Sequence, residues 1–237
     1  MNKSFKRVAF ACCCASLMWF AVNGRFADAD PAASSGTTAI QDLGNGLYRI
    51  GNIKIDKTKR QFSVPGSVIK LQRPDSPIEF IAVSKGGQKR YEAIFEMETS
   101  AVDFNLACIL IGLDASHAIH PKQHFDPQPL KGDAVEIFVS WEGDGKKSHV
   151  PITNILRIAD SSHVTNEWVY TGSYFSQDGR YMADVAGTLV GFVHDPESII
   201  QHRTGLGLGN YGAVTYNPDV LPQPGTPVLL DVSHLTK

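Results

Sequence analysis

Short apolar runs alternate with turn residues along most of this 237-residue chain. Residues 47–50 and 53–56 flank the Gly51-Asn52 pair, and this pattern predicts a β-hairpin with a two-residue turn. Extended segments bounded by glycine, proline or polar residues predict further strands. These strands are expected over residues 61–71, 78–83, 134–141, 167–175, 181–185, 188–193 and 227–232.

Two segments carry helix signals. Ser100 and Asp103 form an S-x-x-D capping pattern ahead of an apolar run that ends near Leu113. The apolar residues of that run point in nearly every direction, which predicts a buried helix. Asp195-Pro196 is typical of a helix start and predicts a second short helix. Because strands cluster and helices are few, we expect an α+β fold: a mostly antiparallel sheet packed on one buried helix, about Ser100 to Leu113.

The first 29 residues have the organisation of a signal peptide. A basic start at Lys3, Lys6 and Arg7 precedes an apolar run, and Ala27-Asp28-Ala29 supplies a small-x-small cleavage site. The apolar run is shorter than the roughly 20 residues that span a bilayer. We therefore expect cleavage near Ala29, a periplasmic or secreted bacterial protein, and no transmembrane span in the mature chain. A membrane anchor and a lipoprotein are the alternatives.

Cleavage would leave residues 30–45 as a flexible lead-in and 46–237 as a single domain. It would also remove three of the four cysteines, so that only Cys108 remains and no intrachain disulfide can form. A disulfide-free exported domain of this size is typical of a bacterial periplasm. The apolar surroundings of Cys108 predict a buried, inert thiol. The formal net charge changes from −2 to −5, which argues against nucleic acid as a partner.

Three blocks carry a family resemblance. IEFIAV from Ile78 leads towards FNLACILIG from Phe104, EWVYTGSYF from Glu167 leads to YMADV from Tyr181, and PGTPV begins at Pro224. In order and spacing the chain resembles the YdjY-domain family of exported bacterial proteins. The resemblance implies a fold and export rather than an activity, and it supplies no catalytic residues. Many members have His-Glu where this chain has Tyr91-Glu92.

A histidine-rich segment is the first candidate for chemistry. His117, His120 and His124 lie within eight residues, between Asp114 and Asp126. Three imidazoles suffice for an open zinc or copper site, so these histidines are candidate metal ligands. Pro121 breaks the helical geometry that would align them, and the alternative is a solvated loop.

Acid–base residues are the second candidate. Glu92 follows a Gly-Gly turn in the first family block, and His194-Asp195 is a pair that can orient a general base. The alternatives are a structural ion pair for Glu92 and a helix cap for Asp195. No G-x-S-x-G, H-E-x-x-H, P-loop or C-x-x-C motif occurs, although a Ser-His-Asp set assembled in space stays open.

These observations favour an exported, non-enzymatic module that binds a small ligand, a metal or a protein partner. One alternative is a periplasmic hydrolase that uses Glu92 and the His194/Asp195 pair. A second is an accessory subunit of an exported redox system. Convergence of Glu92 and His194 in one deep pocket would favour the enzyme. An exposed strand edge or apolar patch would favour the binding module.

Overall fold

The computed structural model describes residues 38–70, 77–143, 145–158, 165–208 and 212–236. The predicted signal peptide, residues 1–29, lies outside these residues. The helices are η1 (Gln88–Glu92), α1 (Ala101–Leu110), η2 (Ile152–Ile155) and α2 (Met182–Ala186). The strands are β1 (Ile40–Gly44), β2 (Leu47–Ile50), β3 (Ile53–Asp56), β4 (Gln61–Val68), β5 (Phe80–Ser84), β6 (Ala93–Met97), β7 (Asp133–Gly143), β8 (Lys146–Pro151), β9 (Leu156–Ile158), β10 (Trp168–Tyr170), β11 (Thr188–Gly191), β12 (Ile200–His202), β13 (Val214–Tyr216) and β14 (Pro227–His234).

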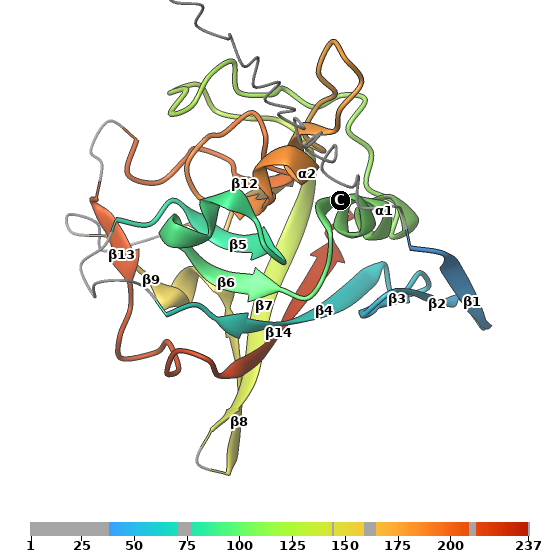
Figure 1. Ribbon diagram of the computed structural model, residues 1–237, viewed down its shortest axis with the longest axis horizontal. Coiled ribbons are helices and arrows are strands. Elements are labelled where there is room, and N and C mark those ends of the chain that lie inside the picture. The colour runs from blue at the N-terminus through green and yellow to red at the C-terminus, as the bar shows by residue number, and fades with distance from the viewer. Residues whose placement is uncertain (1–37, 71–76, 144, 159–164, 209–211, 237) are drawn as a thin grey trace, which may run out of the picture. The chain divides into compact units, whose positions relative to one another are not determined.

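Eight of the strands form a closed barrel. They are hydrogen-bonded in the order β4-β14-β7-β10-β12-β11-β5-β6, and β6 pairs back to β4 (Figure 1). The predicted α+β fold is therefore wrong, because the protein is mostly β and is not a sheet packed on a helix. Side chains alternate between two faces in any strand, so the alternation cannot distinguish an open sheet from a closed one. Closure depends on a pairing between strands distant in sequence.

The barrel closes at a change of partner within β4. The first residues of β4 pair with β3, whereas Gly66–Val68 pair with β6. Pro65 has no N–H to donate at this point, and its carbonyl accepts the Glu98 N–H at 2.8 Å. A Cβ on Gly66 would lie 2.6 Å from the Glu96 carbonyl oxygen, so only glycine permits the close approach of β6. The Pro-Gly pair thus marks the closure point.

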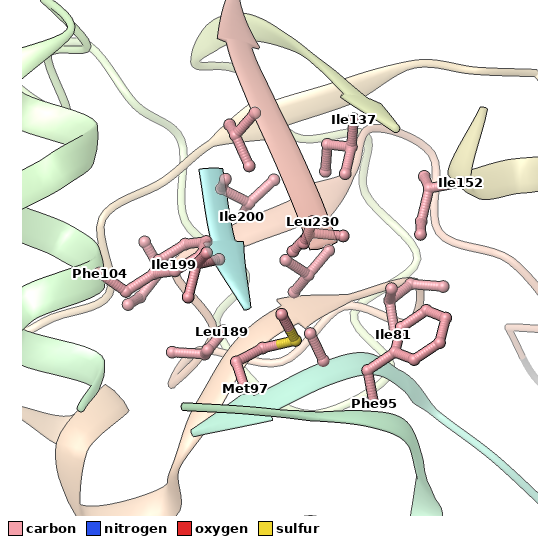
Figure 2. Packing of buried hydrophobic residues seen from close by; sticks show 14 of the residues in the cluster. Ile81, Phe95, Met97, Phe104, Ile137, Ile152, Leu189, Ile199, Ile200 and Leu230 are labelled. Carbon is pink, nitrogen blue, oxygen red and sulfur yellow. The ribbon is translucent and has the colours of Figure 1, made fainter. Parts of the chain in front are cut away.

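The hydrophobic core fills the barrel interior. Along β4 every second residue is buried, and its partner β14 also buries alternate residues, Val228, Leu230 and Val232. Figure 2 shows Ile81 of β5, Phe95 and Met97 of β6, and Leu230 of β14 in one cluster. Phe104 reaches the same cluster from α1, and its ring meets Phe62 edge to face at 5.1 Å between centroids.

The predicted helix near Ser100 exists, with a different role. The Ser100 hydroxyl accepts the Asp103 N–H at 3.1 Å, as the capping pattern predicts. However, α1 is buried on one face only, through Ala101, Phe104, Ala107 and Cys108, and Ile109 is 51% exposed. That face packs against β3, α2 and β11. The thiol of Cys108 is buried as expected, and burial raises its pKa well above the usual value.

The second predicted helix is absent from its expected place. Residues 195–199 form a turn in which the Ser198 N–H bonds the Asp195 carbonyl, and β12 begins directly afterwards. The second α-helix is instead α2, where a strand over 181–185 was predicted. Gly187, with φ of +80°, ends it, and a Cβ there would lie 2.4 Å from the Gly87 Cα.

Three strands continue the sheet beyond β4. The predicted hairpin is confirmed, since β2 and β3 pair antiparallel on either side of Gly51-Asn52, and β1 adds outside β2 (Figure 1). The expected flexible lead-in through residue 45 is corrected here, because residues 40–44 are strand β1. Just before β1, the Thr38 N–H and hydroxyl donate to the two Asp103 carboxylate oxygens at 3.1 and 2.7 Å. This contact attaches the start of the extension to α1.

Candidate functional site

The strand directions bring carboxylates distant in sequence to one end of the barrel. β5 and β6 run parallel, and β11 is antiparallel to β5. The starts of β5 and β6 and the end of β11 therefore meet. Glu79 immediately precedes β5, Glu92 precedes β6, and Asp195 follows β11. All three residues are buried, although each is ionisable. With Lys89, His124 and Glu197, we name this group the barrel-end cluster.

His124 lies between two of these carboxylates. Its Nε2 is 3.0 Å from Glu79 Oε2, and its Nδ1 is 3.8 Å from Asp195 Oδ1. Asp195 and Glu79 raise the pKa of His124 to about 9, so the ring is an imidazolium at neutral pH. The His124 side chain belongs to the loop before β7 and is 37% exposed. The imidazolium of His124 thus occupies the space between Glu79 and Asp195.

Glu92 forms the other half of the cluster. Its Oε1 lies 3.3 Å from Lys89 Nζ, and its side chain is 6% exposed. Although Lys89 is near, Oε1 accepts no hydrogen bond within the described residues. Burial and then the charge of Glu79 raise the pKa of Glu92, against the opposing effect of Lys89. A buried, incompletely satisfied carboxylate at a surface-accessible cluster is a candidate binding group.

A buried hydrogen-bond chain holds Asp195 in place. The Asp195 N–H donates to Gln201 Oε1 at 2.8 Å, and Asp195 Oδ2 accepts the Ser198 hydroxyl at 3.0 Å. Gln201 in turn donates through Nε2 to Thr171 Oγ1 at 2.9 Å. These contacts orient the carboxylate towards His124, as supporting residues do in preorganised sites.

The structure does not bring the three predicted acid–base residues together in one site. Glu92 and Asp195 both belong to the cluster, but the imidazole of His194 does not. That ring is fully buried, with Nδ1 2.5 Å from the Asp126 carbonyl oxygen and Nε2 3.0 Å from that of His202. Sequence reasoning missed Glu79 and Lys89. The available signal for Glu79 was a single charged residue inside the apolar IEFIAV run.

The three candidate metal-binding histidines lie in different surroundings. His117 is exposed, with Nε2 3.6 Å from Asp114 Oδ2, whereas His120 is half-buried and burial lowers its pKa. His124 belongs to the barrel-end cluster. Within the described residues, no group of three or more His, Cys, Asp or Glu side chains is arranged to hold a metal ion.

A Ser-His-Asp set does assemble, on the face shared by β7, β8 and β14. Ser140 Oγ is 2.8 Å from His149 Nδ1, and Asp231 Oδ2 is 3.9 Å from the same nitrogen. A catalytic triad requires the serine and the carboxylate on opposite ring nitrogens. This set therefore lacks the geometry that activates a serine nucleophile.

The extension carries a second surface of interest. A groove of about 220 Å³ runs over β2, β3 and β4, lined in part by Leu43, Leu47, Arg49 and Lys54. We name it the extension groove. Leu43 is 51% exposed at its border. Arg49 and Lys54 lie directly opposite each other on β2 and β3, and neither has an ion-pair partner among the residues described.

The protein is a closed eight-stranded barrel with a three-stranded extension of its sheet. A cluster of ionisable residues lies at one end of the barrel. The chain belongs to the YdjY-domain family, whose family model matches residues 53–233. This match includes the barrel strands and, of the three extension strands, only β3. No curated protein and no solved structure matches significantly. In the part of the chain described, no helix has both the length and the hydropathy needed to cross a membrane.

Proposed function

We propose that this protein is an exported, non-enzymatic binding module whose extension groove takes an extended, acidic segment of a partner protein. The observation that carries the proposal is a groove combining exposed leucines with two unpaired cationic side chains. Leu43 and Leu47 would pack against apolar residues of the segment. Its carboxylates would pair with Arg49 and Lys54.

The charges of the groove support an acidic partner. Like charges directly opposite on neighbouring strands are destabilising. Arg49 and Lys54 are such a pair, and Asp56, whose carboxylate also lines the groove, is ion-paired with Lys59. A carboxylate placed between the two side chains would relieve the repulsion. An extended segment suits the site because β1 is the edge strand of the extension, beside the groove.

The hydrolase alternative receives less support. It requires His194 to work with Asp195 and Glu92, but the His194 ring nitrogens face two backbone carbonyls in the interior. Asp195 is oriented towards His124 instead. This arrangement supports a structural role for His194 and a binding role for the cluster.

Site-specific photo-crosslinking tests the proposal in the bacterial host. A photoreactive residue at position 43 should form an adduct whose crosslinked peptide is rich in Asp, Glu and apolar residues. Position 109 on α1, equally exposed, is the matched control and should not give this adduct. The R49E/K54E double variant should lose it. Identical adducts at both positions, or an adduct that survives charge reversal, would contradict the proposal.

A further inference from the structure

We propose that a cavity beside the loop from β13 to β14 is a second binding site and that it takes a small apolar monocarboxylate, with an aliphatic or an aromatic body. The loop, residues 217–226, passes the end of β4 (Figure 1). No residue lines both this cavity and the extension groove. The inference therefore goes beyond the proposed partner binding, and each can fail without the other.

The cavity has a volume of about 280 Å³ and mostly apolar walls. Pockets for drug-sized ligands measure roughly 300–1,000 Å³, so this one suits a smaller molecule. Val68, Ile69 and Leu221 contribute aliphatic side chains to the walls. Removing apolar surface from water is favourable, so an apolar ligand body that covers these side chains would be stabilised.

The wall formed by the loop is held in place at both ends. The Asn217 N–H donates to the Ile155 carbonyl oxygen at 2.7 Å, and the Gly225 N–H donates to the Val68 carbonyl oxygen at 2.8 Å. Three residues between these bonds are prolines that line the cavity, Pro218, Pro222 and Pro224. Because proline fixes φ, the wall is preformed, and binding pays little conformational entropy to order it.

Polar groups that can bind an anion lie on the same walls. Lys70 lines the cavity, is exposed, and has no ion-pair partner among the residues that the structure describes. The Tyr216 hydroxyl and the Gln223 side-chain amide also belong to the lining, and neither makes a hydrogen bond within the described part of the chain. The cavity thus combines one uncompensated cation with two uncharged donors.

The class of ligand follows from these walls and this single cation. One carboxylate matches the charge of Lys70 and accepts hydrogen bonds from uncharged donors such as Tyr216 and Gln223. A phosphate monoester carries about 1.5–2 negative charges near pH 7 and would exceed the single cation. Walls that are apolar apart from a few polar groups favour an apolar body, with the polar groups fixing its orientation.

NMR titration of the protein with octanoate and with phenylacetate tests the proposal and distinguishes the two bodies. At least one acid should bind saturably and give intermolecular NOEs to the Tyr216 ring. Each acid is compared with its alcohol, octan-1-ol or 2-phenylethanol. In K70M the ratio of acid affinity to alcohol affinity should fall about three- to fivefold, the range expected for a charge pair near the surface. K70R, which keeps the charge, should preserve the ratio.

An exposed lysine away from the cavity provides the matched control. Lys57 lies in the turn between β3 and β4, and K57M should leave the ratio unchanged. Binding of either acid alone supports the proposal and identifies the body. The proposal is overturned if neither acid binds, or if K70M keeps the ratio of the unmodified protein. NOEs to Leu47 in place of Tyr216 would also overturn it, because they would assign the acid to the extension groove.

Discussion

The barrel-end cluster and the extension groove carry charge in opposite ways. In the cluster, His124 pairs with Glu79 and Asp195, and Lys89 pairs with Glu92. In the groove, Arg49 and Lys54 stand opposite each other without a counter-ion in the described residues. Buried charge is costly unless it is paired, whereas water and salt screen exposed charge. The cluster thus supplies its own counter-charges, whereas the groove leaves two cations available to a partner.

The barrel core and the extension groove should also differ in how much their side chains contribute to the free energy of unfolding. Leu230 is fully buried in the barrel, so L230A should reduce the free energy of unfolding by about 2–5 kcal/mol. Leu43 is exposed at the groove, and L43A should cost less than about 0.5 kcal/mol. Urea denaturation of both variants measures the difference. Equal losses would contradict the division into a stabilising barrel and a binding extension.

The next effect compares a buried histidine, His194, with an exposed one, His117. H194A would remove the ring whose two nitrogens face buried carbonyl oxygens, at a cost of about 1–3 kcal/mol for each group left unsatisfied. H117A changes an exposed ring and should leave stability within about 0.5 kcal/mol of the original. Thermal denaturation compares the two variants. If H194A were as stable as the unmodified protein, a structural role for the His194 ring would be contradicted.

A smaller effect should appear in the pH dependence of stability. Carboxylates raise the folded-state pKa of His124 from 6.5 to about 9. Its contribution is therefore complete below pH 6.5 and is lost as the pH rises through 9. The melting temperature should fall between these values, and it should fall less in H124A. Parallel pH profiles for the two proteins would show that the imidazolium does not stabilise the cluster.

The smallest effect concerns the groove. K54E would place a carboxylate opposite Arg49 and should stabilise the protein by about 0.2–1 kcal/mol while weakening partner binding. K146E is the matched control, because Lys146 lies opposite Gly143 and has no charged residue directly across the strand pair. Chemical denaturation of both variants measures the difference. Destabilisation by K54E would argue that Lys54 serves the fold.

Local signals in the sequence were reliable where the interactions are local. The hairpin around Gly51-Asn52 and the Ser100 cap were predicted because neighbouring residues make those contacts. The helix expected at Asp195 did not form because the chain enters β12 at Ile200, and β12 pairs with β10 and β11. Glu92 and Asp195 were identified as candidates, but His124, which lies beside Asp195, was assigned to a metal site.

The sequence by itself determined the YdjY family, the alternating strands and the capped helix, because these depend on residue type and short spacing. Only the tertiary structure decided that the sheet closes, since closure depends on β6 returning to β4. The tertiary structure also decided which residues come together in the barrel-end cluster. The parallel β5 and β6 and the antiparallel β11 end together, so Glu79, Glu92 and Asp195 meet although more than a hundred residues separate the first from the last.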